Sequence, residues 1–101
     1  MSAAERLRRN YRPAFLRYLP RREEAALHSA YELGRSAVSD GVSLLDLAQI
    51  HHATLLEVLQ TSSPDDLAET AAAASEFFCE VLATYEMTQR RYLEDNARSR
   101  S

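Results

Sequence analysis

The chain has 101 residues, enough for one compact domain, and it carries a formal net charge of -3 at pH 7. Two glycines and three prolines are present among many Ala, Leu, Glu and Arg residues, so the composition favours an all-α fold. The single cysteine, Cys79, excludes an internal disulfide, and there is neither a secretory signal pattern nor a run of ~18 apolar residues that would span a membrane. We therefore expect a cytoplasmic protein with one helical domain over residues 1–101 and no membrane association.

The first predicted helix runs from the N-terminus to about Tyr18. Ser2 and Glu5 have the spacing of a capping box, in which side chains bond the free backbone N–H groups of the first turn. Pro13 lies inside the segment, so the helix either begins near Arg12 or is kinked. The apolar positions recur at helical spacing and predict a buried stripe of Leu7, Tyr11, Phe15 and Tyr18.

The second predicted helix spans roughly Arg22 to Ser39 and ends at Asp40-Gly41, because glycine readily takes the left-handed conformation that closes a helix. Its small residues allow close approach of another helix. They form two adjacent stripes, one of Ala26, Ala30, Leu33 and Ala37 and the other of Leu27, Tyr31, Gly34 and Val38.

The third predicted helix begins at Ser43 and Asp46 and ends near Gln60. One side carries Leu44, Leu47, Ile50, Thr54 and Val58, and further leucines surround it at positions 45, 55, 56 and 59. The adjacent His51 and His52 point in different directions on a helix, so we expect one of them in a packed position and the other exposed.

The fourth predicted helix follows Ser63-Pro64-Asp65-Asp66, a capping Ser with Pro at the first helical position and two acids at the positive helix end. It continues to about Asp95 and outruns the others. A heptad-like seam consists of Leu67, Ala71, Ala74, Phe78, Val81, Tyr85, Thr88 and Tyr92, flanked by Phe77 and Cys79.

This wide apolar arc predicts that the four-helix domain dimerises into a larger helical bundle. The expected dimer interface contains Phe77, Phe78, Val81, Leu82 and Tyr85. The alternative is that the same arc is wholly buried in the core of a monomer.

Charge is distributed unevenly along the sequence. Residues 1–22 carry seven arginines and one acid, whereas residues 23–86 carry twelve acids and only Arg35 as a cation. The Arg-rich arm is either a solvated helix face, or an arm that packs on the acidic middle of a second subunit or on nucleic acid. The sequence pI of 5.6 argues against nucleic acid, which favours a domain pI above ~9.

No catalytic or metal site, and no cofactor, is predicted. Adjacent histidines diverge and only one thiol is present, whereas a helical zinc site needs ligands one turn apart. The surroundings of Cys79 are apolar or acidic, which raises the pKa of a thiol and makes it unreactive. A glycine-rich phosphate loop is missing, since Gly34 and Gly41 stand alone.

Two segments, GVSLLDLAQIHH at 41–52 and EFFCEVLATYEM at 76–87, resemble the N-terminal regulatory domain of RsbU-type phosphatases. The spacing of Tyr11 and Tyr18 and the Leu27–Val38 helix fit the same pattern, so the resemblance covers nearly the whole chain. It implies a four-helix domain that dimerises and recruits a switch kinase of the RsbT kind. Docking of this kinase then stimulates an attached metal-dependent serine/threonine phosphatase that acts on an anti-anti-sigma factor. That catalytic domain is absent from the sequence, so we expect a fragment or a free-standing regulator.

The predicted partner surface is a stripe of the fourth helix that lies outside its heptad-like seam. Glu76, Cys79 and Ala83 belong to this stripe, with Ala72 and Glu86 at its ends, and they form a shallow groove of small residues rimmed by acids. A face of the second helix, Glu24, His28 and Tyr31, is expected beside the groove. Alternatively, the alanines only allow close packing within the dimer.

A second function remains open, a nucleic-acid-binding helical regulator that uses the Arg-rich arm. Salt dependence separates the two functions, because binding to nucleic acid weakens steeply as salt rises.

Overall fold

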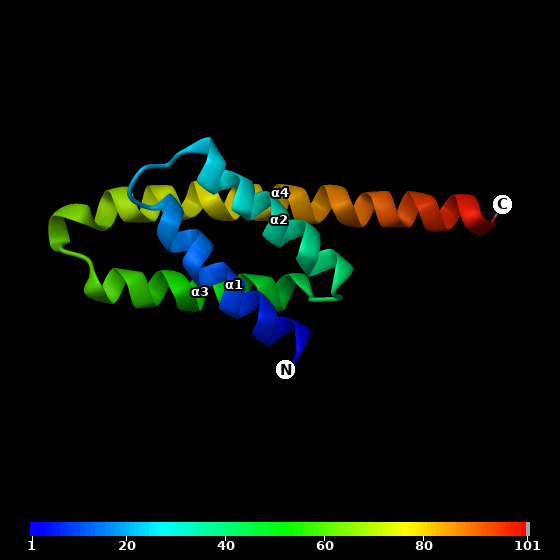
Figure 1. The fold of residues 1–101 in the computed structure, drawn as a ribbon, viewed down its shortest axis with the longest axis horizontal. Coiled ribbons are helices and arrows are strands. Elements are labelled where there is room, and N and C mark those ends of the chain that lie inside the picture. The colour runs from blue at the N-terminus through cyan, green and yellow to red at the C-terminus, as the bar shows by residue number, and fades with distance from the viewer. Residues whose placement is uncertain (101) are drawn as a thin grey trace.

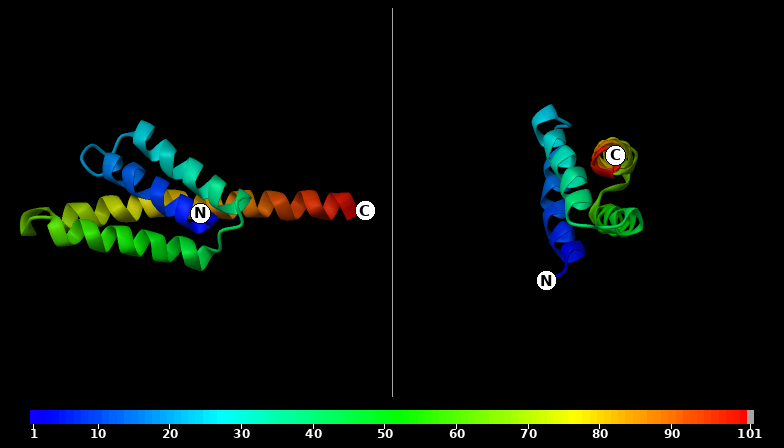
Figure 2. Two further views of the ribbon diagram at one scale, coloured as in Figure 1. Left: turned by 60° about the horizontal axis from the view of Figure 1, so that its bottom comes forward. Right: turned by 90° about the vertical axis from the view of Figure 1, so that its right-hand side faces the viewer.

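The computed structural model describes the backbone of residues 1–100 and the side chains of residues 1–98. It contains the helices α1 (Ala3–Tyr18), α2 (Glu24–Ser39), α3 (Leu44–Thr61) and α4 (Leu67–Arg100), and one 3-10 turn, η1 (Pro64–Asp66). The predicted all-α fold with a long C-terminal helix is confirmed. The helices form two layers, with α1 and α2 crossing one side of the α3–α4 pair (Figure 2). The C-terminal part of α4 projects beyond the other three helices (Figure 1).

Most helix ends follow the local signals in the sequence. The Ser2 and Ser43 hydroxyl oxygens accept hydrogen bonds from the backbone N–H groups of Glu5 and Asp46, each at 3.1 Å. Gly41 has φ +74° just after α2, the left-handed conformation expected of a residue that closes a helix. Pro13 does not mark the start of the first helix, since α1 begins at Ala3 and continues through the proline.

Two helix starts differ from the prediction. Helix α2 begins at Glu24 rather than Arg22, because Arg22 has φ +51° and its N–H donates to the Tyr18 carbonyl at 2.9 Å, closing α1. The Ser63 hydroxyl donates to the Asp66 carboxylate at 2.9 Å and makes no bond to a backbone N–H group. The first turn after Ser63 is therefore 3-10, and α4 begins only at Leu67.

The core lies between the two layers and is built around aromatic side chains. The predicted stripe of α1 is buried as expected, as are Ala26, Ala30, Leu33 and Ala37 of α2. Phe77 of α4 is fully buried, with its ring centroid 5.4 Å from that of Tyr11 and 5.5 Å from that of Phe15. His51 of α3 is also buried, whereas His52 is exposed, so the prediction for the two histidines is confirmed.

The buried face of α4 differs from the predicted heptad seam. The residues of α4 that are buried in the structure are Ala73, Ala74, Phe77, Val81, Thr84 and Tyr85. The seam positions Leu67, Ala71 and Tyr92 are exposed, and Phe78 is only half-buried. The reason is that α1 and α2 cross the middle of α4 obliquely, so its two ends have no layer above them (Figure 1).

Helices α2 and α4 make the most extensive contact of any pair. At its centre, a Cβ atom on Gly34 would lie 2.5 Å from the Val81 carbonyl oxygen. Near this contact the Tyr85 hydroxyl donates to the Val42 carbonyl at 2.9 Å, which ties the α2–α3 turn to α4. The register between α2 and α4 is thereby fixed.

Candidate functional site

The candidate binding surfaces among the described residues are exposed parts of α2, α3 and α4. Across residues 1–98, no three His, Cys, Asp or Glu side chains come together in a way that could hold a metal ion. Within the same residues, no helix is both long enough and apolar enough to cross a membrane. Cys79 is exposed on α4. The surfaces that remain to be considered lie on α2, α3 and α4.

A shallow depression lies where the predicted partner face of α2 meets α4. Glu24, His28 and Tyr31 line it together with Leu27 and Glu80. The rings of His28 and Tyr31 are stacked, with centroids 5.6 Å apart and planes inclined by 15°. The His28 Nε2 atom lies 3.4 Å from a carboxylate oxygen of Glu32, one turn further along α2. We call this set of five lining residues the α2/α4 depression.

Helical spacing predicts that the three α2 residues share one face, whereas Leu27 and Glu80 were not predicted to join them. Glu80 is four residues after Glu76 and three before Ala83, so helical spacing places it along the same side of α4. That spacing was the available signal. Its position opposite Tyr31, however, depends on the register between the two helices.

Glu76, another predicted partner residue, is held by its own chain. It accepts a hydrogen bond from the Tyr18 hydroxyl at 2.7 Å, and Arg22 lies 3.8 Å away from its second carboxylate oxygen. Arg22 also donates to the Glu69 carbonyl at 2.9 Å. Burial, followed by the hydrogen bond to the Glu76 carboxylate, which stabilises the neutral phenol, raises the pKa of Tyr18 to about 12. Glu76 therefore fastens the end of α1 to α4, while Cys79 and Ala83 are exposed on α4.

The predicted dimer residues divide into two groups. Phe77 and Val81 have no exposed surface and Tyr85 is 7% exposed, so these three belong to the core of the subunit itself. Helices α1 and α2 cover that side of α4 in the single chain, and the assignment of these residues to a dimer interface stays a prediction. Phe78 and Leu82 are half-buried and remain accessible at the edge of the core.

An apolar surface is found on the side of α3 opposite its buried residues Leu47, Ile50 and Thr54. On α3, Leu45 is 67% and Leu56 is 49% exposed. Eleven residues separate these two leucines, which is close to three helical turns, so both lie on one side of α3. The half-buried residues beside them are Leu55 and Leu59 of α3 and Phe78 and Leu82 of α4. We call these six residues the α3/α4 face.

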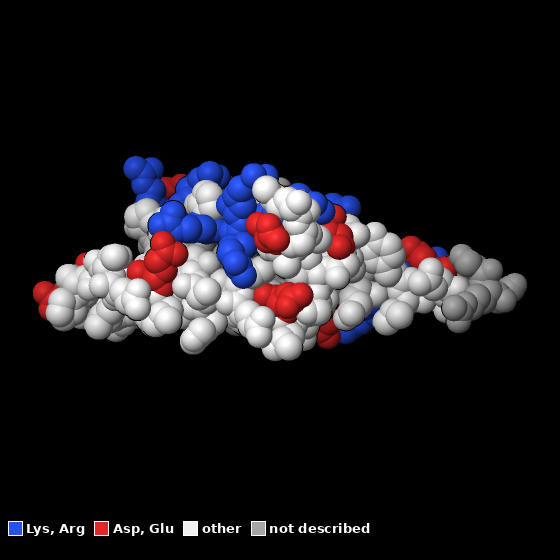
Figure 3. All heavy atoms as spheres, turned by 90° about the horizontal axis from the view of Figure 1, so that it is seen from below, with Lys and Arg blue, Asp and Glu red and all other residues white. Residues whose placement is uncertain are grey.

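The charged side chains are also distributed unevenly over the surface. Seen from the side of α3, arginines gather over α1 at the upper edge, and most of the surface below them is uncharged (Figure 3). Part of the Arg-rich arm pairs with acids of its own subunit. Arg12 lies 2.8 Å from Glu57 of α3, and Arg22 reaches Glu76. These pairs reduce the charge that the arm presents to nucleic acid.

One known protein family matches most of this sequence. Residues 9–88, which reach from α1 well into α4, match the family model described as the N-terminal domain of the phosphoserine phosphatase RsbU. Neither the curated proteins nor the solved structures gave a match. The matched segment is most of the chain and includes residues of all four helices. The chain therefore belongs to the family of RsbU N-terminal domains.

Proposed function

We propose that residues 1–101 form one non-catalytic regulatory domain that dimerises and recruits an RsbT-like switch kinase. Recruitment stimulates an attached or associated serine/threonine phosphatase, which acts on an anti-anti-sigma factor. Membership of the RsbU family supports a role in phosphatase signalling. The same proposal makes the chain itself a binding module.

The α3/α4 face is the observation that carries the proposed dimerisation. Exposed leucines gathered on one side of a helix are a common mark of a protein interaction site. The α3–α4 pair has α1 and α2 on one side only (Figure 2), and Leu45 and Leu56 lie on the side of α3 opposite its buried residues. A second copy that applies the same face across a two-fold axis covers both sets of leucines at once. This pairing produces the larger helical bundle that the family resemblance implies.

The α2/α4 depression supports the proposed recruitment of a partner. It combines a stacked His28–Tyr31 pair with carboxylates from both helices, Glu24 and Glu80. Aromatic side chains are common anchors in protein interfaces, and a rim of one charge accelerates association with a partner of the opposite charge. We therefore expect the kinase to present basic side chains to this depression.

Calorimetry with a purified RsbT-like kinase tests the recruitment. Replacing Glu24 with Arg reverses a charge at the edge of the depression and should weaken binding roughly tenfold. The matched control is Glu5→Arg, because Glu5 is also an exposed acid in the first turn of a helix but lies on α1. Ala83→Arg adds a bulky charge on α4 and should weaken binding as well.

Circular dichroism is measured alongside to confirm that each variant is folded. Unchanged affinity in both Glu24→Arg and Ala83→Arg would remove the α2/α4 depression as the docking site. An equal loss of affinity in Glu5→Arg would show that the overall charge of the domain, rather than this surface, controls binding.

A further inference from the structure

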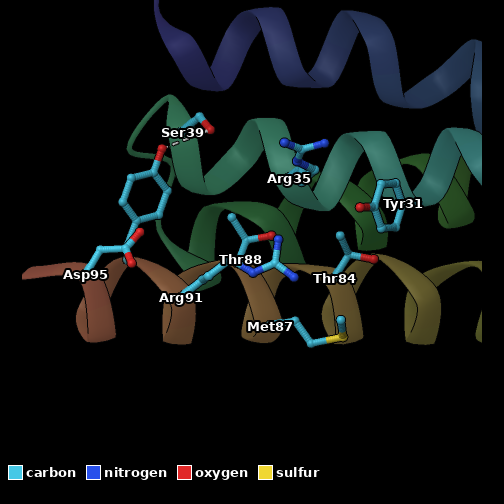
Figure 4. A pocket seen from close by; sticks show the side chains of 9 residues that line it. Tyr31, Arg35, Ser39, Thr84, Met87, Thr88, Arg91 and Asp95 are labelled. Carbon is cyan, nitrogen blue, oxygen red and sulfur yellow. Dashed lines mark hydrogen bonds between the residues drawn. The ribbon is translucent and has the colours of Figure 1, made fainter.

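A second hollow between α2 and α4 lies further along the two helices, beside the close contact at Gly34. It has a volume of about 250 Å³ and receives side chains from both helices. Tyr31 and Arg35 reach it from α2, and Thr84, Thr88 and Arg91 reach it from α4 (Figure 4). We call this hollow the two-arginine cleft.

Two cations from different helices, Arg35 and Arg91, line the same cleft, and Asp95 is the carboxylate that lines it with them among the described residues. Neither Arg35 nor Arg91 takes part in any ion pair found among the described residues. Arg90, the neighbour of Arg91, instead pairs with Glu86 at 2.9 Å on the same helix. Arg35 is moreover the only cation between residues 23 and 86, where twelve acids lie. Two positively charged guanidinium groups that face the same space repel each other unless an anion lies between them.

The polar groups around these arginines are mainly hydrogen-bond donors. The Thr84 hydroxyl already donates its hydrogen to the Glu80 carbonyl at 2.9 Å and therefore cannot donate to a ligand. The hydroxyl groups of Tyr31 and Thr88 point toward the cleft and make no hydrogen bond to another described residue (Figure 4). At the other end of the cleft, the Ser39 and Tyr92 hydroxyls lie 3.5 Å apart, beside Asp95. An anion therefore fits at the end formed by Arg35, Thr88 and Arg91.

We propose that the two-arginine cleft binds the phosphate group of a small phosphate-bearing molecule. The planar guanidinium group matches the oxygens of phosphate with two parallel hydrogen bonds, and two such groups suit its double charge. Hydroxyl donors complete the set of hydrogen bonds to the remaining oxygens. The volume holds a phosphate group with a short ester substituent, whereas a folded protein segment is too large.

Titration followed by NMR tests the site on the intact chain, in chloride buffer at constant ionic strength. Inorganic phosphate and glycerol 3-phosphate are the two probes, and malonate is a carboxylate probe of similar charge. We expect saturable shifts of the backbone amides near Arg35, Thr88 and Arg91. Arg35→Gln and Arg91→Gln should each reduce affinity for phosphate roughly tenfold or more, because each removes a charged hydrogen-bond donor.

Arg90→Gln is the matched control, since it removes the same charge from the adjacent position of α4 but does not line the cleft. Retained affinity in this variant supports the site, and tighter binding of one phosphate probe identifies free phosphate or a phosphate ester as the preferred form. Three results overturn the proposal: no saturable binding of either phosphate probe, equal losses of affinity in Arg90→Gln and Arg35→Gln, or tighter binding of malonate than of both phosphates.

Discussion

His51 occupies an unusual position for a titratable side chain. Its ring stacks on Phe78 with centroids 4.0 Å apart, and its Nδ1 atom lies 2.6 Å from the Tyr11 hydroxyl. Burial, together with charge repulsion from the neighbouring His52, lowers the pKa of His51 to about 4. At neutral pH the ring is uncharged, and it joins α1, α3 and α4 through packing and one hydrogen bond.

We predict that the domain becomes less stable as the pH falls from about 6.5 to about 4, partly because of this residue. In this range the unfolded chain binds a proton at His51 that the folded chain does not bind, so the free energy of unfolding decreases as the pH decreases. The contribution is at most ~1.4 kcal/mol per pH unit. Urea denaturation at several pH values measures it.

His51→Gln should flatten this pH dependence, even if it lowers stability at pH 7. The control His52→Gln changes an exposed ring next to it and should retain most of the slope. Carboxylates also titrate in this range, but they are common to all three proteins. Identical slopes for wild type and His51→Gln would contradict the assignment to His51.

Phe77 is the aromatic centre of the core, and its removal should be severely destabilising. Phe77→Ala leaves a cavity among Tyr11, Phe15 and Tyr18 and should lower the free energy of unfolding by ~3–5 kcal/mol. Cys79→Ala, two residues away but exposed, should change it by less than ~0.5 kcal/mol. Both are measured by urea denaturation at one protein concentration. A loss below ~1 kcal/mol for Phe77→Ala would contradict its position in the core.

At the scale of the helices, Gly34 sets how closely α2 approaches α4. In an exposed helix position, replacing Gly with Ala stabilises by ~1 kcal/mol, because it reduces the freedom of the unfolded chain. Here the new Cβ atom meets the Val81 carbonyl oxygen at 2.5 Å and the Thr84 Cβ at 2.8 Å. Both of these neighbours belong to the rigid middle of α4.

We predict that Gly34→Ala destabilises the domain, because overpacking against the backbone of another helix costs ~1–3 kcal/mol and exceeds the gain in helix propensity. Thermal denaturation measures the change. Ser36→Ala, at an exposed position of the same helix, is the control and should leave the melting temperature nearly unchanged or raise it. A higher melting temperature for Gly34→Ala would mean that α2 and α4 are further apart than described.

The extent to which sequence alone predicted these helices depends on how local each signal is. Ser2, Ser43 and Gly41 act within one turn of backbone, and the helix ends they predict are confirmed. By contrast, Phe77 and Phe78 are adjacent and equally apolar. Which of them faces the core is decided by where α1 and α2 cross α4, and no pattern within α4 contains that information.

The same distinction applies to the candidate surfaces. Glu24, His28 and Tyr31 share a face through helical spacing, which a sequence shows directly. Glu80 joins them only because α2 and α4 pack in one register. Leu45 and Leu56 read as ordinary core leucines until the layer of α1 and α2 is seen to cover the opposite side of α3.

For the molecule as a whole, the two layers leave the domain with unequal sides. One side of the α3–α4 pair is covered by α1 and α2 (Figure 2), while Leu45 and Leu56 of the α3/α4 face are exposed. A domain of ~100 residues has a small core, so burying such a face in a dimer adds substantially to its stability. The dimer that we propose thus serves both the fold and the family function.

Sedimentation equilibrium of the wild-type chain and of Leu56→Glu tests whether the domain dimerises through the α3/α4 face. We predict that the wild type has twice the mass of one chain at micromolar concentration, and that Leu56→Glu sediments as a folded monomer. Leu16→Glu places the same charge at an exposed leucine of α1, and it should remain a dimer. A folded wild-type monomer at high micromolar concentration, or a dimer that Leu56→Glu does not weaken, would contradict the account.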